Sequence, residues 1–216
     1  MEKFKTLKDH VYDYIAEHIR DGSIQPGQRI NENIICENLS ISRTPVREAL
    51  IQLAAEGILD SQSRKGFTIK SMSEENIRQI YQVLGILDGY AATLACEQLT
   101  DRDYTDLEFY IGTMDLAVQT GNFEMYYKQQ ETFHNAYIEK CGNDVLIETI
   151  SKTRNKLLKK GYAAHADDTL KDVFYSTNEE HRKILSLLRE KNKAALFTYI
   201  SETHWKPVYA SYDVII

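Results

Sequence analysis

The segment from residue 42 to residue 50 combines side chains that can bind nucleic acid. Arg43 and Arg47 are four residues apart, so on a helix they project to the same side, where one can fork onto a guanine edge while the other holds a phosphate. Ser42 and Thr44 offer hydroxyls, and the free amide N–H groups of a helix start are further phosphate donors. These residues predict a DNA-reading surface; the plainer alternative is a capped helix with solvated arginines.

A second group of positive charges lies further along the chain, at Arg64 and Lys65. Gly66 follows them, and a glycine lets the tip of a hairpin approach DNA closely. Residues 41–70 contain five basic and three acidic side chains, so their positive surplus is concentrated at one helix start and one hairpin tip. A DNA-reading module needs positive charge at these two places.

Four elements must position these side chains. Apolar residues at helical spacing predict a helix over residues 7–21, and a shorter helix follows at residues 30–39. Because Pro45 is tolerated only in a first turn and disfavours helical geometry in the residue before it, we expect Thr44 to be the N-cap of a third helix. A hairpin over residues 58–70 completes the order of a winged helix-turn-helix, whose third helix enters the major groove of DNA.

From Ser73 onward the pattern is helical, without a strand signal. Thr100 and Asp103 form a capping box, and all the expected helix breaks are at Thr100, Gly121-Asn122, Gly142-Asn143, Asp167-Asp168, Thr177-Asn178 and Asn192. These breaks delimit six or seven helices. The predicted fold is therefore mainly α, with a winged helix-turn-helix of three helices and a β-hairpin over residues 1–72 and an all-α helical bundle over residues 73–216.

Composition and charge exclude several classes of protein. A chain of 216 residues that is 43% hydrophobic and 27% charged is an ordinary globular protein and not a disordered or fibrous one. No apolar run approaches the ~20 residues that cross a bilayer, and the first residues are too charged for a signal peptide, so we expect a cytoplasmic protein without a membrane partner. The net charge of −6 lies beyond residue 70, because residues 1–70 hold ten basic and ten acidic side chains.

Residues 25–32 and 39–58 closely resemble the DNA-binding domain of GntR-family transcriptional regulators, through the motifs Gln-Pro-Gly-Gln-Arg-Ile-x-Glu and Ser-Arg-Thr-Pro-Val-Arg-Glu-Ala-Leu. The resemblance implies that Arg43, Thr44 and Arg47 read or grip the operator, and that Gly66 and its neighbours form the wing. Asn33 departs from the pattern, at a position where some members of the family place an arginine that touches DNA.

The helical part resembles the all-α effector domain, called FCD, that follows this DNA-binding module in the FadR subgroup of the family. His134, His181 and His204 carry the resemblance. In metal-binding members, histidines at such places converge on one ion inside the bundle, and neutral imidazoles suit a divalent metal such as zinc or nickel. The alternative is three unrelated histidines, one buried and two exposed, which is the reading we apply to His10, His18 and His165.

Two features count against a metal site. Gln130 stands four residues before His134, where many metal-binding relatives have an aspartate, and an amide is a poorer ligand. The separation of 23 residues between His181 and His204 is one more than the spacing expected in the family. An extra residue inside a helix would swing a side chain by about 100°, although the break at Lys191-Asn192 could absorb it.

The sequence therefore predicts a ligand-responsive transcriptional regulator, a repressor that dimerises through its helical domain and binds a palindromic operator. A bound metal would anchor its effector, a small organic acid with a carboxylate group. Catalytic motifs such as GxSxG, HExxH, a phosphate-binding Gly-rich loop or paired CxxC are missing from the sequence, which predicts that the protein is not an enzyme. Two alternatives stay open: a regulator whose ligand binds without metal, and a metal-dependent helical-bundle enzyme fused to a DNA-binding module.

Overall fold

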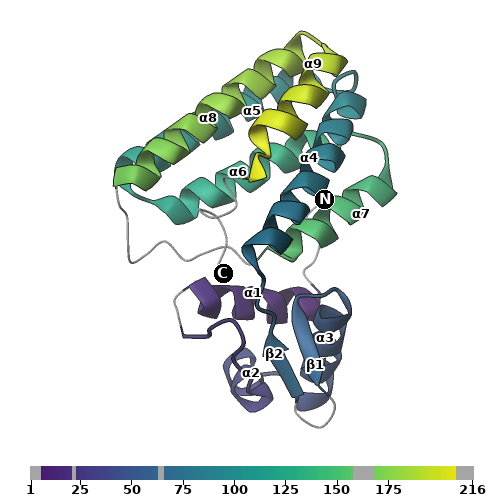
Figure 1. Cartoon of the computed structure of the whole chain (residues 1–216), viewed down its shortest axis with the longest axis vertical. Helices are drawn as coiled ribbons and strands as arrows, with labels where there is room; N and C mark the ends of the chain where they lie inside the picture. Colours follow the sequence, from purple (N-terminus) through teal and green to yellow (C-terminus); the bar gives the residue numbers. More distant parts are fainter. Residues whose placement is uncertain (1–5, 21–22, 63–65, 158–167, 208–216) are drawn as a thin grey trace. The chain divides into compact units, whose positions relative to one another are not determined.

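The computed structural model describes residues 6–20, 23–62, 66–157 and 168–207 of the chain. The chain divides into two compact units (Figure 1), one built mostly from residues 1–74 and the other from Glu75–Arg154 and Tyr162–Tyr212. Within the described ranges, every helix is too short or too polar to cross a membrane.

The described part of residues 1–74 forms three helices and two paired strands, which Figure 1 shows with their labels. Its elements, in chain order, are α1 (Leu7–Arg20), α2 (Glu32–Leu39), α3 (Arg43–Ala55), β1 (Leu59–Gln62) and β2 (Gly66–Ile69). The two strands pair antiparallel, with Leu59 opposite Ile69. This is the order predicted for a winged helix-turn-helix.

The helices and strands of the first unit close over one apolar core. Each element contributes the residues that its periodicity turns inward, and those that are at most 3% exposed include Val11, Ile15, Ile35, Val46, Leu50, Leu53, Leu59, Phe67 and Ile69. Complete burial of one such aliphatic or aromatic side chain stabilises the folded state by roughly 1.5–3 kcal/mol. The core therefore fixes the positions of α3 and of the hairpin.

The segment before α2 is attached to the hairpin. Arg29 pairs with Thr68 in an isolated antiparallel bridge. The Ile30 N–H donates to the Phe67 carbonyl at 2.9 Å, and the Ile69 N–H donates to the carbonyl of residue 28 at 3.0 Å. These bonds fix Arg29 beside β2.

The start of α3 lies two residues earlier than the sequence predicts. Its N-cap is Ser42, with extended backbone geometry, and Thr44 lies inside the first turn, so the expectation that Thr44 caps the helix is wrong. The first helical hydrogen bond runs from the Val46 N–H to the Ser42 carbonyl at 3.5 Å and closes across Pro45. Pro45 is tolerated there because the first N–H groups of a helix have no intrahelical acceptor.

The described residues of the second unit are helical, apart from short turns. In chain order the elements are α4 (Glu74–Ala95), α5 (Asp101–Thr120), α6 (Phe123–Ile138), α7 (Asp144–Asn155), α8 (Asp168–Arg189), α9 (Lys193–Thr198) and the π-helical turn η1 (Tyr199–His204). Thr100 and Asp103 form the predicted capping box at the start of α5, and Asn192 caps α9. The predicted mainly-α fold with a bundle of six or seven helices is confirmed.

One predicted helix break is wrong, because α8 runs unbroken through Thr177 and Asn178. The Thr177 hydroxyl donates to the Val173 carbonyl one turn back, at 2.9 Å. Asn178 is fully buried, and its amide donates to the Ile111 carbonyl of α5 at 3.0 Å. Thr and Asn have a low intrinsic preference for helix, but here the hydrogen bonds of both side chains compensate for it.

Two glycines let α4 pack closely against α9 and η1. A Cβ atom at Gly85 would lie 3.0 Å from the Ser201 carbonyl oxygen and 3.0 Å from Trp205 Cβ, and a Cβ atom at Gly89 would lie 3.2 Å from atoms of α9. Gly85 and Gly89 share the buried face of α4 with Asp88. The close packing therefore brings Asp88 next to the last helical segment.

Candidate nucleic-acid interface and candidate metal centre

The first turn of α3 presents the predicted DNA-binding side chains to solvent. Ser42, Arg43, Thr44 and Arg47 are all exposed, and 66% and 53% of the two arginine side chains is accessible. Val46 lies on the opposite face of the helix and is buried in the core. An exposed helix start with two guanidinium groups and two hydroxyls can contact both phosphates and base edges.

Glu32, the first residue of α2, holds both arginines. Its carboxylate oxygens lie 3.3 Å from Arg43 Nε and 3.1 Å from Arg47 Nη1, and only 10% of the Glu32 side chain is exposed. Exposed ion pairs contribute on the order of 1 kcal/mol or less, so DNA can compete for these guanidinium groups. Glu32 thus orients the arginines without locking them.

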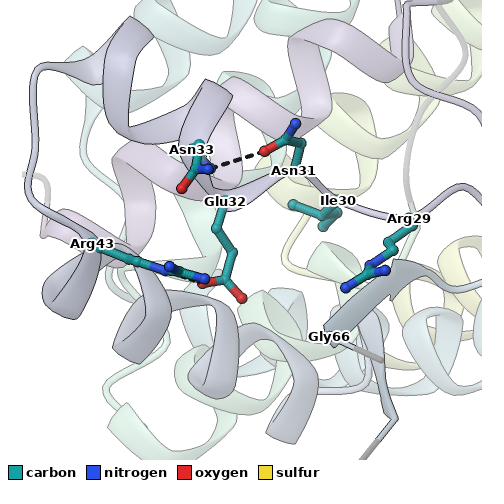
Figure 2. Close-up of a pocket in the computed structure, with 7 residues that line it drawn as sticks. All are labelled: Arg29, Ile30, Asn31, Glu32, Asn33, Arg43 and Gly66. Carbon is teal, nitrogen blue, oxygen red and sulfur yellow. Dashed lines mark hydrogen bonds and ion pairs between the residues drawn. The ribbon is translucent and has the colours of Figure 1, made fainter. Parts of the chain in front are cut away.

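A pocket of about 430 Å³ opens between α2, α3 and β2 in the first unit. Figure 2 shows Arg43 and Arg29 approaching it from opposite sides, with Glu32 between them. Among the described residues, the lining consists of Arg29, Ile30, Asn31, Glu32, Asn33, Arg43 and Gly66. Two guanidinium groups, two amides and the Glu32 carboxylate line this recess, so it can receive a polar group of DNA.

Arg29 lies against the wing at Gly66, where a Cβ atom would make only ordinary van der Waals contact with it. The Gly66 φ of +85° belongs to the region that favours glycine, and a Cβ atom there would lie 3.5 Å from Arg29 Nε. The sequence predicted a role for Gly66 but not for Arg29 or Glu32, although both belong to the motif at residues 25–32. Arg64 and Lys65, the other predicted wing residues, lie outside the described residues.

Separate helices of the second unit bring His134, His181 and His204 together. They belong to α6, α8 and η1, and each offers a ligand atom within 4.8 Å of those of the other two. All three are buried, with exposed fractions of 3%, 0% and 6%. The alternative of one buried and two exposed histidines is therefore wrong.

Asp88 of α4 orients the His134 ring. His134 Nδ1 lies 2.8 Å from Asp88 Oδ2 and 2.6 Å from the Tyr137 hydroxyl. The Tyr137 hydroxyl donates to Asp88 Oδ1 at 2.6 Å, and the Trp205 indole N–H donates to Asp88 Oδ2 at 2.8 Å. Burial acts to raise the pKa of Asp88, but His134 and the other neighbours outweigh it and lower that pKa to about 2, so the carboxylate is ionised.

The other two rings are held in the same way. Glu180 Oε2 lies 3.0 Å from His204 Nδ1, and Asn178 Oδ1 lies 3.3 Å from His181 Nδ1. Because Nδ1 of every ring faces an oxygen, Nε2 is the nitrogen left for a ligand. The Nε2 atoms of His134 and His204 are 3.0 Å apart, and Nε2 of His181 is buried with no hydrogen-bond partner among the described residues.

The chemistry of this donor set fits a divalent metal ion. A metal-binding histidine typically gives one ring nitrogen to the ion and the other to an oxygen that fixes the ring. Burial lowers the pKa of His134 to about 4, although Asp88 opposes this, and lowers the pKa of His181 well below its usual value. Both rings are therefore neutral at pH 7, which is the form that binds metal, and an ion would satisfy the orphaned Nε2 of His181.

His204 is the last residue of a π-helical turn. The Trp205 N–H donates to the Ile200 carbonyl at 3.1 Å, five residues back instead of the four of an α-helix. Such a turn contains one residue more than an α-helical turn. It therefore accommodates the one additional residue between His181 and His204, relative to the spacing expected in the family. Lys191, with a φ of 52°, marks the predicted break earlier in the segment.

The carboxylate nearest to the histidines comes from a different helix than the resemblance suggested. The expected aspartate position holds Gln130, whereas Asp88 contacts the first histidine from α4. A signal for it exists in the sequence, since Asp88 is the single charged residue between Val83 and Ala95. Glu180 and Asn178 carried no such signal, because both stand among other polar residues of α8.

Two protein-family models match most of the chain. The model described as bacterial regulatory proteins, gntR family, matches residues 7–69, and the FCD domain model matches residues 79–203. The first range contains Arg29, Glu32 and the α3 arginines, and the second contains all three histidines. The resemblance seen in both parts of the sequence is confirmed.

Relatives and solved structures agree with these matches. The chain is 30% identical over 175 residues to the Nta operon transcriptional regulator of Aminobacter aminovorans, covering 80% of each protein. It is 26% identical over 150 residues to the HTH-type transcriptional regulator McbR of Escherichia coli K12, covering 69% of this chain and 68% of McbR. The solved structure of E. coli McbR/YncC shares the fold, with a TM-score of 0.80 at 23% identity, covering 97% of this chain and 98% of that one. These relatives are transcriptional regulators, which confirms that the chain is not an enzyme and removes the enzyme alternative.

Proposed function

The chain belongs to the GntR family of bacterial regulatory proteins and carries an FCD domain, and from this premise we propose that it is a ligand-responsive repressor. Residues 1–72 bind operator DNA, and residues 73–216 bind a small effector and form a homodimer. Its place of action is the cytoplasm, where the DNA is. The observation that carries the DNA-binding part is the pair of exposed arginines, Arg43 and Arg47, held side by side by Glu32 at the start of α3.

In this proposal the first turn of α3 enters the major groove. Arg43 and Arg47 leave Glu32 for a guanine edge and a phosphate, while Ser42 and Thr44 bind phosphate oxygens. Arg29 adds a cation on the wing side of the same pocket. Arg64, Lys65 and Gly66 would contact the DNA backbone.

The second unit holds the effector. His134, His181 and His204 would bind zinc or nickel through Nε2, with Asp88, Asn178 and Glu180 fixing the rings. When bound, the ion supplies positive charge and open coordination positions that suit a carboxylate group of the effector. Support for this comes from the three buried rings, which converge within 4.8 Å, and from the orphaned nitrogen of His181.

An exposed apolar stripe on α4 supports a homodimer. Val83, Ile86 and Tyr90 follow one another at helical spacing and are 47%, 55% and 51% exposed. Such a stripe on a polar chain is typical of a surface that a partner covers. A two-fold dimer would set the distance between two α3 helices and match a palindromic operator, and an effector that prefers one dimer arrangement would weaken DNA binding by linkage.

The DNA-binding proposal is tested with Arg43→Ala and Arg47→Ala. Operator duplexes are first selected from a random pool with the wild-type protein, and binding is then followed by fluorescence anisotropy. Each substitution should weaken operator binding about 10- to 100-fold, the usual contribution of an arginine on a base edge. Arg189→Ala, which removes an exposed ion pair with Glu108 in the second unit, should leave binding unchanged. Wild-type affinity in both α3 variants would disprove the assignment.

The metal proposal is tested by elemental analysis of protein purified without chelators. Wild-type protein should carry close to one zinc or nickel per chain, and His134→Ala should carry little or none. His10→Ala is the matched control because His10 is an exposed residue of α1. A metal-free wild-type protein that still releases DNA when an effector is added would instead support the metal-independent regulator.

A further inference from the structure

Asn178 of α8 connects His181 to the neighbouring helix α5. Its side chain is fully buried. The amide nitrogen donates to the Ile111 carbonyl at 3.0 Å and to Asp115 Oδ1 at 2.6 Å, while the amide oxygen lies 3.3 Å from His181 Nδ1. An amide nitrogen has two hydrogens to donate, so both are used on α5 and the oxygen faces the histidine.

The two acceptors on α5 decide which end of the Asn178 amide is the nitrogen. A backbone carbonyl and a carboxylate accept hydrogen bonds but do not donate them. The reversed amide would place its oxygen against the oxygens of Ile111 and Asp115 and its N–H groups against His181. The orientation with nitrogen toward α5 satisfies every partner, and it needs Asp115 to accept the second N–H.

The orientation of Asn178 sets the tautomer of His181. A neutral imidazole carries a proton on one nitrogen and a lone pair on the other. Because the Asn178 oxygen only accepts, His181 Nδ1 carries the proton and the lone pair is on Nε2. This Nε2 is buried with no hydrogen-bond partner among the described residues. With the amide reversed, the proton would be on Nε2, and the ring could not bind an ion through that atom.

His181 differs in this respect from the other two histidines. Nδ1 of His134 and Nδ1 of His204 each lie within 3.0 Å of a carboxylate oxygen, and both oxygens of a carboxylate accept hydrogen bonds. An amide instead has an acceptor at one end and donors at the other. The tautomer of His181 therefore depends on a residue beyond its direct partner.

We propose that Asp115 is a positioning residue of the metal centre, which holds the Asn178 amide in the orientation that presents the Nε2 lone pair of His181 to the ion. This inference rests on the metal-binding part of the function proposed above. The other oxygen of Asp115, Oδ2, pairs with the Arg182 guanidinium, so Oδ1 is the oxygen that remains for Asn178. Asp115 acts through Asn178 and not as a ligand of the ion.

A purely structural role for Asp115 makes a different prediction. Asp115 and Arg182 form an ion pair between α5 and α8, which pack against each other (Figure 1). If this were its whole function, Asp115→Leu and Arg182→Leu would lower the melting temperature alike, and neither would change zinc affinity. A positioning role predicts that only Asp115→Leu weakens zinc binding, because Arg182→Leu leaves Oδ1 in place.

The first test measures the zinc affinity of the full-length chain by competition with a chromogenic chelator. Asp115→Leu should weaken zinc binding about 10- to 100-fold, the usual loss when a residue that orients a metal ligand is removed. Asp115→Asn removes the same charge but keeps an acceptor oxygen, so its affinity should stay close to that of the wild type. Arg182→Leu is the matched control and should not weaken binding.

Two outcomes of the zinc titration would overturn the proposal. One is wild-type affinity in Asp115→Leu. The other is an equal loss in Asp115→Asn and Asp115→Leu, which would show that the charge of Asp115 matters and its hydrogen bond does not. If Asp115→Leu does not fold, Asp115→Met replaces it, because methionine also lacks a strong acceptor and its unbranched side chain adapts to irregular space.

The second test needs no metal. Nitrogen NMR of isotope-labelled histidine distinguishes the two tautomers of a neutral imidazole, and His181→Gln identifies the signals of His181 in the metal-free chain. The wild type should show the Nδ1–H form, and Asp115→Leu should populate the Nε2–H form. An Nε2–H ring in the wild type, or an unchanged ring in Asp115→Leu, would refute the proposed chain of hydrogen bonds.

Failure of this inference can be told apart from failure of the proposed function. A wild-type chain that binds no zinc, but whose His181 tautomer changes in Asp115→Leu, would refute the metal centre and support the control of His181 by Asp115. A wild-type chain with one zinc ion and an unchanged affinity in Asp115→Leu would support the metal centre and refute the positioning role.

Discussion

Glu32 orients Arg43 and Arg47, the two arginines of the proposed DNA-binding surface, although it does not belong to that surface. It is nearly buried, yet it touches both exposed arginines of α3. On DNA, its negative charge would remain close to the phosphates and oppose non-specific attraction. In the proposed complex, Glu32 would therefore favour duplexes whose base edges form hydrogen bonds with Arg43 and Arg47 strong enough to replace these ion pairs.

We expect Glu32→Gln to bind random DNA more tightly and to discriminate less. Removing one negative charge next to two guanidinium groups should strengthen binding to a random duplex roughly three- to tenfold at low salt, with little gain on the operator. Fluorescence anisotropy at several salt concentrations measures both. Glu37→Gln, at an exposed position of the same helix, is the control, and an equal change in the two variants would contradict a specific role for Glu32.

The buried histidines should make the metal-free protein sensitive to acid. The His134 pKa is about 4 in the folded protein and about 6.5 in an unfolded chain. Between these values the unfolded chain holds a proton that folded His134 does not, so the free energy of unfolding falls as the pH drops from about 6.5 to 4. The loss from His134 alone should be about 3 kcal/mol, and His181 acts in the same direction.

Urea unfolding with a chelator present, at several pH values between 7 and 4.5, measures this loss. His134→Gln should lose stability less steeply with pH, whereas His10→Gln should follow the wild type. A flat wild-type profile over this range would show that the rings are not buried as neutral groups.

The sequence predicted the three converging histidines better than the residues that support them. His134, His181 and His204 were named because they lie at the places where metal-binding members of the family have histidines. Asp88 stands out in the sequence as a lone charged residue in an apolar stretch, but the sequence does not show that α4 packs against His134. That contact depends on close packing at two glycines, which is a tertiary property. The prediction that Thr44 is the N-cap was also wrong. It considered only the preference of the residue before Pro45, whereas in the structure the Ser42 carbonyl accepts the first helical hydrogen bond.

At the scale of elements, the contact between α4 and the last helical segment holds the centre together. Gly85 lies against the backbone of η1, and one turn later Asp88 receives hydrogen bonds from α6 and from Trp205. Any widening of this contact would draw Asp88 away from His134. The helix order was predictable from caps and periodicity, but this separation between helices was not.

We expect Gly85→Ala to destabilise the protein and weaken metal binding together. The new Cβ would lie 3.0 Å from backbone and side-chain atoms of η1 and Trp205, and overpacking of this kind costs about 1–3 kcal/mol. Gly112→Ala, in α5 with no atom within 4 Å of its Cβ, should instead stabilise by roughly 0.5–1 kcal/mol. Urea unfolding and zinc titration measure both effects, and wild-type stability in Gly85→Ala would refute the close contact.

At the scale of the whole molecule, the proposed repressor depends on joining two copies of the chain. A single DNA-binding unit has few basic side chains at α3 and no net charge over residues 1–70. Its affinity for DNA should therefore be low. Two linked modules bind a palindrome far more tightly, because the second contact is made at a high effective concentration. The charge balance fits this division, since the net charge of −6 lies beyond residue 70, outside the DNA-binding residues.

We expect Ile86→Asp to convert the dimer into a monomer and to weaken operator binding by about 100-fold. Light scattering after size exclusion gives the mass, and anisotropy gives the affinity. Val145→Asp introduces the same charge at a residue of α7 that is 74% exposed and should change neither quantity. A dimer that persists in Ile86→Asp would place the interface elsewhere.

The π-helical turn has a consequence for how distant relatives are recognised. An insertion inside a helix normally rotates everything beyond it, but here the Trp205 to Ile200 hydrogen bond confines the extra residue to one turn, and His204 still faces its partners. One additional residue in this turn is therefore compatible with His204 lying beside His134 and His181. Searches that demand a fixed spacing between the second and third histidines would discard a chain with this additional residue, whereas searches that allow one residue of slack would retain it.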